Sequence, residues 1–216
     1  GREMIYFSAE DVAAVKAKVC AESGLKWIST NAALSAHILC AIIPLQLPKK
    51  AQTLTVGNVI NIRGRVPSKS SEDQSRYLGN ALYINVSETE TKTSVHDLTR
   101  GDIAKFLRAT FDKLTSDHIS QAMQNIVDSL EDGYGYPGLN IFKPIMAVNN
   151  QSKFDVYNVD FGAGRPLRVL PQDVGDHIML FPAADGGIEV YLRDFVSLKR
   201  QKKLLEPDWQ TRLFDI

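Results

Sequence analysis

The strongest constraint on the fold is the run STNAALSAHILCAII, residues 29–43, which is apolar on nearly every side of a helix. Ser29 or Thr30 can cap the start of this helix, and Pro44 should stop it. Because a helix that is apolar all round has no face suited to water, it should be buried among other elements. The rest of the chain therefore has to supply structure that covers it.

The other segments predict helices and strands in a layered order. FSAEDVAAVKAKVCAES begins with Ser8 three residues before Asp11, which is a capping-box pattern. The remaining expected elements are strands in 54–66 and 79–90, helices in 101–115 (cap Asp102) and 116–132 (cap Ser116 or Asp117), strands in 153–161, 176–183 and 187–194, and a helix in 195–206. This order predicts an α/β (α+β layered) domain over residues 1–216, with a mixed β-sheet covered by helices.

The charge balance argues against some classes of binding partner. The 216 residues include 25 Lys plus Arg and 25 Asp plus Glu, so the formal net charge is zero. A chain without net charge has no global field for nucleic acid or an anionic membrane, and no apolar run approaches the roughly 20 residues that cross a bilayer. We therefore expect a cytoplasmic protein with no nucleic-acid or membrane partner. Cys20 and Cys40 lack metal-ligand spacing, so we expect no metal.

Catalytic groups are hard to find in this sequence. GxSxG, HExxH and P-loop motifs are absent. His37 falls in the buried helix and is interpreted as a satisfied core histidine, whereas His96, His118 and His177 each neighbour an aspartate. Adjacent residues on a helix or strand point in different directions, so none of these pairs is a catalytic dyad by spacing. We predict no catalytic residue in this chain.

A backbone feature is more distinctive. Asp160-Phe161-Gly162-Ala163-Gly164 interrupts two strand-like runs with residues that permit positive φ and close backbone approach. The Asp160 carboxylate can accept hydrogen bonds from turn amides or pair with a nearby arginine. From the residues alone this is a structural turn.

The segment VDFGAGRPLRV resembles the DFGWG motif of the BAHD superfamily of CoA-dependent acyltransferases, with Ala163 in place of the usual tryptophan. Five more segments resemble that family in the same order along the chain: FSAEDVAAVKAKV, STNAALSAHILCA, INIRGRV, RYLGNAL and DGGIEVYL. The resemblance implies the C-terminal half of such an enzyme, a half-domain similar to chloramphenicol acetyltransferase. We expect the N-terminal catalytic half to be absent from this chain.

The family's HxxxD motif, whose histidine is the general base, belongs to that N-terminal half. No histidine here has an aspartate four positions later. The resemblance therefore implies a partner half carrying HxxxD, from the same gene or a separate chain, without which this chain is inactive. It also implies acyl-CoA as co-substrate, no permanently bound cofactor, a small-molecule hydroxyl or amine acceptor, and a role in secondary metabolism.

Site residues follow from the same resemblance. Asp160 is implied to pair with an arginine, for which Arg63 is the candidate, and the structural motif comprises Asp160, Phe161, Gly162, Gly164 and Arg63. The candidates for the wall of the CoA and acceptor channel are Tyr77, Gly79, Asn80, Asn149, Asn150 and Ser152. Lys69 and Arg76, on a polar loop in residues 67–76, are further candidates for contacts with phosphate or pantetheine.

Two alternatives remain open at this stage. A condensation-type domain would share the layout but take thioesters from a carrier protein. A non-catalytic half would bind acyl-CoA or a partner without turnover. A half that has lost its neighbour should expose apolar residues along the seam, whereas an independent binding module should be polar there.

Overall fold

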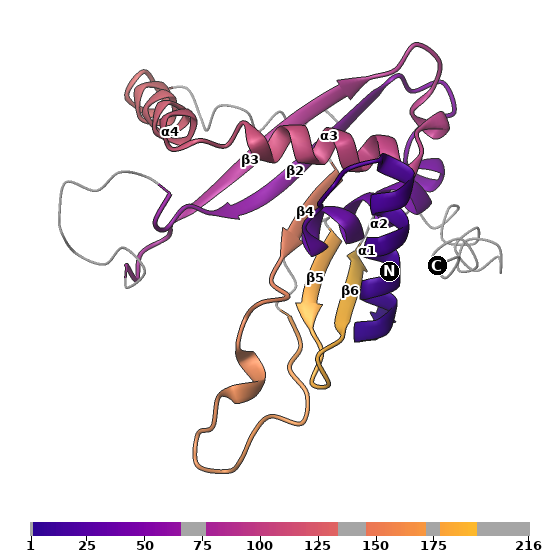
Figure 1. The fold of residues 1–216 in the computed structure, drawn as a ribbon. Helices are drawn as coiled ribbons and strands as arrows, with labels where there is room; N and C mark the ends of the chain where they lie inside the picture. Colours follow the sequence, from indigo (N-terminus) through magenta and orange to yellow (C-terminus); the bar gives the residue numbers. More distant parts are fainter. Residues whose placement is uncertain (1, 66–76, 134–145, 172–177, 194–216) are drawn as a thin grey trace.

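The computed structural model describes residues 2–65, 77–133, 146–171 and 178–193. Within these residues the chain forms a six-stranded sheet in the order β1-β6-β5-β4-β2-β3 (Figure 1). The elements are β1 (Arg2–Phe7), α1 (Ala9–Ser23), α2 (Thr30–Gln46), β2 (Thr53–Asn61), β3 (Leu82–Glu90), η2 (Val95–Asp97), α3 (Arg100–Asp112), α4 (Ser116–Glu131), β4 (Met146–Asn150), η3 (Val156–Asn158), β5 (Ile178–Pro182) and β6 (Ile188–Arg193). The expectation of an α/β fold with a mixed sheet covered by helices is confirmed.

The sheet is mixed because β4 pairs in parallel with both β2 and β5, whereas β1/β6, β5/β6 and β2/β3 are antiparallel. The turn expected between the last two strands is present: Ala183 N donates to the Gly187 carbonyl at 3.0 Å, and Gly186 has φ 88°. Because β2 and β4 run in the same direction, their C-terminal ends lie beside each other. That shared edge positions the candidate site.

The apolar helix α2 lies in the core, as its sequence predicts. Leu34, Ile38 and Leu39 are fully buried between the sheet and the other helices. The helix does not stop at Pro44 but continues to Gln46, because Leu47 N donates to the Ile43 carbonyl at 2.9 Å and closes the last turn. A proline near a helix end removes one hydrogen bond without ending the helix.

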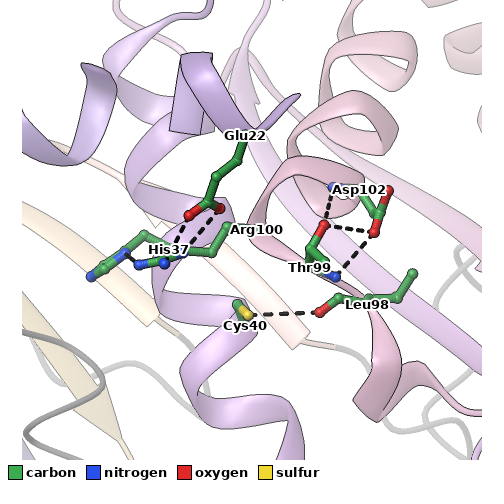
Figure 2. Close-up of polar contacts among 7 residues, drawn as sticks. All are labelled: Glu22, His37, Cys40, Leu98, Thr99, Arg100 and Asp102. Carbon is green, nitrogen blue, oxygen red and sulfur yellow. Dashed lines mark hydrogen bonds and ion pairs between the residues drawn. The ribbon is translucent and has the colours of Figure 1, made fainter. Parts of the chain in front are cut away.

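Hydroxyl side chains cap the helices as expected, but two of the caps lie earlier in the sequence than predicted. Ser8 and Asp11 form the predicted box at the start of α1. For α3 the cap is Thr99, and Asp102 is the third helical residue that hydrogen-bonds back to it (Figure 2). For α4 the cap is Thr115 rather than Ser116 or Asp117. In both cases a threonine hydroxyl before the expected cap accepts from the backbone three residues later.

A polar cluster joins the three helices that cover the sheet. Arg100 at the start of α3 pairs with Glu22 of α1 through contacts of 2.8 and 3.1 Å, and its Nη1 lies 3.5 Å from His37 Nδ1 of α2 (Figure 2). Gly101 permits this approach, since a Cβ there would lie 2.6 Å from the Glu22 carbonyl oxygen. His37 is 2% exposed and has the core position that its helix predicts.

One strand assignment from the sequence was wrong, and one strand was missed. Residues 153–161 form no strand; they contain the single turn η3, where the Asn158 amide donates to the Asp155 carboxylate. Such local side-chain hydrogen bonds compete with strand pairing. The strand lies earlier, at β4, and β1 was not anticipated. The expected helix in 195–206, the loop 67–76 with Lys69 and Arg76, and His177 lie outside the described residues.

No helix in the described segments is long and apolar enough to cross a membrane. The thiols of Cys20 and Cys40 donate to the Leu25 and Leu98 carbonyls at 3.5 and 3.7 Å, and both side chains are half-buried against the core. The ranges that the structure describes contain no group of three or more His, Cys, Asp or Glu that could hold a metal ion.

Candidate functional site

A cavity of about 440 Å³ lies between the helices and the sheet, beside the C-terminal ends of β2 and β4. The N-terminus of α2 contributes Ser29, and the C-terminal part of α3 contributes Arg108 and Phe111. The strands contribute Asn58 of β2 and Asn150 of β4. A site made by several elements at the ends of neighbouring parallel strands is a common arrangement for small-molecule binding.

Strand alternation sets which side chains of β2 and β4 share a face of the sheet beside this cavity. Asn58 lies in register with Val148, and two residues further along β4 Asn150 shares the same face. Side chains at alternate positions of a strand share a face, so Asn149 points to the opposite side of the sheet. Of the six predicted channel residues, Asn150 is the one that lines the cavity.

Asn58 is the most buried polar residue that lines the cavity. It is 3% exposed, and its Nδ2 has no hydrogen-bond partner among the described residues. Leaving a buried donor unsatisfied costs about 1–3 kcal/mol, so such groups are rare and call for a physical explanation. Asn150, by contrast, is satisfied, because its Oδ1 accepts from the backbone amide and hydroxyl of Ser152 at 2.9 and 2.7 Å.

The outer part of the cavity carries positive charge. Arg65 and Lys153 line it and are exposed. Arg108 also lines it and is engaged: its Nε lies 2.9 Å from the Asp112 carboxylate, and its guanidinium lies 5.1 Å from the centre of the Trp27 ring. An anionic group entering from this side would meet cations and an aromatic face before reaching Asn58.

Arg63 holds the segment that begins at Tyr77. Its Nε donates to the Tyr77 carbonyl at 2.8 Å and its Nη2 to the Gly79 carbonyl at 2.6 Å. Its guanidinium also lies 6.0 Å from the Tyr77 ring centre. Tyr77 and Gly79 are therefore fixed beside the end of β2 without lining the cavity, and Asn80 next to them is exposed.

The expected pairing of Asp160 with Arg63 is wrong within the described residues. Asp160 Oδ1 instead accepts from the backbone amides of Gly162 and Gly164 at 2.7 and 3.0 Å. Both glycines have φ near 95°, at 97° and 93°, which side chains other than glycine rarely adopt. Two turn amides satisfy the carboxylate, and the Arg63 donors are already taken by carbonyls.

The turn itself lies in the loop between β4 and β5, which projects away from the sheet (Figure 1). Its residues do not line the cavity, and Phe161 is 94% exposed. Only the flanks of this loop pack: Val156 and Val169 contact the cluster of Met179, Phe181 and Tyr191 on the sheet face opposite the helices. The DFGAG segment is thus a preformed turn at the tip of an anchored loop.

Sequence reasoning missed Trp27, Asn58 and Arg108. Asn58 carried a usable signal, because it is an uncharged polar residue on the same strand face as Val56 and Ile60, both apolar. Trp27 and Arg108 carried none, since they meet only when α1, its following loop and α3 pack together. Contacts between remote segments are not visible in a one-dimensional pattern.

Comparison with known proteins gives the following. The model of the Transferase family matches residues 2–202. An uncharacterized acetyltransferase of Arabidopsis thaliana is 24% identical over 168 residues, which cover 77% of this chain and 37% of the relative. TRI101 of F. sporotrichioides, solved with coenzyme A and T-2, has TM-score 0.74 and 18% identity, covering 97% of this chain and 49% of TRI101. Vinorine synthase has TM-score 0.66 and 18% identity, covering 93% and 47%.

The first condensation domain of the CDA synthetase shares the fold less closely, with TM-score 0.55 and 12% identity over 99% of this chain and 44% of that domain's chain. In each of these comparisons the chain spans about half or less of the other protein's length.

Proposed function

This chain belongs to the Transferase family of BAHD-type acyltransferases, and we propose that it is part of an enzyme that moves an acyl group from acyl-CoA to a small-molecule acceptor. The acceptor atom is a hydroxyl oxygen or an amine nitrogen. The family match over residues 2–202 carries this proposal. TRI101, a structural neighbour, has been solved with coenzyme A, which supports acyl-CoA as the co-substrate.

The cavity beside β2 and β4 forms one wall of the channel for CoA and acceptor. Its outer cations, Arg65 and Lys153, suit the phosphates of CoA, and its inner surface suits an uncharged arm. Ser152 and the segment Tyr77–Asn80 border this wall at the strand ends and complete it when the rest of the enzyme is in place, whereas the Asn149 side chain lies on the other face of the sheet. Residues 1–216 act as one domain in this proposal.

The general base comes from an HxxxD motif outside this chain. Its histidine takes the proton from the acceptor hydroxyl or amine while that atom attacks the thioester carbonyl carbon. The tetrahedral intermediate collapses with cleavage of the C–S bond, and the CoA sulfur leaves as a thiolate that takes up a proton. This chain positions substrate in that reaction and supplies no proton carrier, so it is inactive without the half that carries HxxxD.

The test is release of CoA thiol from acetyl-CoA by this chain combined with the half that carries HxxxD, in the presence of a panel of alcohols and amines. Thiol release that depends on an acceptor supports the proposal. Lys153→Glu should raise the KM for acetyl-CoA several-fold, because it reverses a charge that faces the phosphates, whereas Lys113→Glu, outside this cavity, should not. Thiol release unaffected by any acceptor would count against acyl transfer.

The likeness to a condensation domain gives the second candidate its support. That candidate predicts acyl transfer from a carrier protein bearing a phosphopantetheine thioester, and little from free acetyl-CoA. Supplying the same acyl group on both carriers in parallel assays separates the two. Binding of CoA without turnover from either donor would instead favour the third alternative, a non-catalytic half.

A further inference from the structure

We propose that Asn58 recognises the pantetheine arm of CoA, its side-chain amide donating a hydrogen bond to an amide carbonyl or hydroxyl oxygen of that arm. This inference rests on the proposed function, because it takes CoA as the occupant of the cavity. The observation that motivates it is the Asn58 Nδ2 atom, which is buried and has no partner among the described residues, in a residue that lines the cavity. Rotation of the side-chain amide presents this donor to the cavity.

The position of Asn58 fits an uncharged oxygen better than an anion. Its neighbours on the same strand face are Val56 and Ile60, both buried and apolar, and Val148 lies beside it in register. An anion brought to this point would lose its hydration with one neutral donor as compensation, which is unfavourable. A carbonyl or hydroxyl oxygen needs one donor.

The order of groups along the cavity matches the order of groups along CoA. Arg65 and Lys153 are exposed at the outside, whereas Asn58 is buried at the inside. CoA carries its phosphates at one end and an arm of alkyl, amide and hydroxyl groups that leads away from them. With the phosphates at the outer cations, the arm extends along Ile60 and Leu114 toward Asn58. The volume of about 440 Å³ accommodates part of the molecule, as a channel wall should.

A purely structural role explains Asn58 poorly. A buried amide that donates to nothing reduces the stability of the fold, and a leucine of similar shape would fit the apolar surroundings at no such cost. The chain retains a group that is unfavourable until something binds. Residues at binding sites commonly show this conflict between stability and function.

Asn85 provides a matched control. It lies opposite Asn58 on β3, so both side chains share one face of the sheet, and it is also buried, at 6% exposed. Unlike Asn58, Asn85 is satisfied, because its Nδ2 donates to the Ser87 hydroxyl at 2.9 Å. It lines a separate cavity on the other side of α3.

The experiment is calorimetric titration of CoA into the intact protein and into its Asn58→Leu and Asn85→Leu variants, with thermal melting of all three. Asn58→Leu should raise the Kd for CoA about 3- to 10-fold, the effect of one neutral hydrogen bond, while its Tm stays equal or rises. Asn85→Leu should leave the Kd unchanged and lower the Tm. Adenosine bisphosphate, the nucleotide part of CoA without the arm, should bind wild type and Asn58→Leu equally.

The outcomes separate this inference from the proposed function. Equal CoA binding by wild type and Asn58→Leu overturns the role of Asn58 and leaves acyl transfer standing. The same conclusion follows if Asn58→Leu weakens the binding of CoA and of adenosine bisphosphate equally. Absence of CoA binding by the wild-type protein overturns both. The side-chain amide NMR signal of Asn58 in the wild-type protein provides a further readout, and its loss in Asn58→Leu assigns it. This signal should shift when pantetheine is added.

Discussion

At the scale of single residues, Arg63 and Asp160 form hydrogen bonds with other groups and not the ion pair that the family resemblance implied. Arg63 and Asp160 each satisfy their hydrogen-bonding groups locally, on backbone carbonyls and on backbone amides. The sequence did suggest that Asp160 could bind turn amides, because Asp followed by glycines is a turn pattern. The sequence does not indicate which groups accept from Arg63, because they are backbone carbonyls and every residue has one.

The Arg63 contacts predict a local effect of its removal. Arg63→Gln should release the segment after Tyr77, because two hydrogen bonds from a charged donor are lost. We expect exchange of the Ile62 backbone amide, which donates to the Ala81 carbonyl at the end of this segment, to accelerate about tenfold, with a loss of about 1 kcal/mol in the free energy of unfolding, since the site is partly open to solvent. Hydrogen exchange with mass spectrometry measures this. Arg65→Gln, two residues away, is the control, and equal exchange in both variants would contradict the role given to Arg63.

At the scale of elements, helices were predicted better than strands, and for a physical reason. A helix is specified by its own residues, through caps and an apolar face, as Ser8 and Asp11 show for α1. A strand is completed by a partner elsewhere in the chain. Residues 153–161 have suitable composition but Asp155 and Asn158 satisfy each other, whereas the five residues of β4 lie between two strands that complete them.

The capping boxes predict how stability depends on pH. Hydrogen bonds from the Thr99 hydroxyl and backbone amide lower the pKa of Asp102 below its ordinary 3.8, and the corresponding bonds from Ser8 lower the pKa of Asp11. A carboxylate whose pKa is lower in the folded state contributes stability above its unfolded pKa and loses it as pH falls through the folded pKa. The contribution is therefore intact at neutral pH and declines below about pH 4.

Asp102→Asn should consequently lower stability at pH 7 by up to about 1 kcal/mol and differ less from wild type at pH 2 to 3, in about the range of a helix cap near the surface. Urea unfolding at several pH values measures the difference. The variant should retain some acid sensitivity, because Asp11 still titrates, and the Asp11→Asn, Asp102→Asn double variant should have a flatter profile than either single one. A pH-independent deficit in Asp102→Asn would show that the carboxylate charge is not involved.

At the scale of the whole molecule, the loop between β4 and β5 projects from the helix-covered sheet (Figure 1). Apolar side chains lie exposed on this loop and on the segment before β3. Phe161 is 94% exposed and Leu167 and Leu78 are each 99% exposed. The first two belong to the loop between β4 and β5, whose flanks are anchored by Val156 and Val169, so the loop is held in place with its apolar tip outward. An anchored loop with an exposed apolar tip is suited to an interface.

The occupant that we expect for this tip is the half that carries HxxxD, and substitution there tests it. Phe161→Ser and Leu167→Ser should leave the Tm of this chain nearly unchanged, because neither side chain is buried in it, yet each should weaken association with that half at least tenfold, since burying such a side chain contributes about 1.5–3 kcal/mol. Leu130→Ser, at an exposed position of α4, which lies away from this loop (Figure 1), should change neither quantity appreciably. Thermal melting measures the Tm of each variant. Titration with the separately produced half measures the affinity, and thiol release provides a second readout of association. If the tip served self-association of this chain instead, sedimentation would show the wild-type chain self-associated and the Phe161→Ser and Leu167→Ser variants monomeric, while the affinity for the other half stayed constant. If all three variants weakened association alike, the interface would not be localised to the loop.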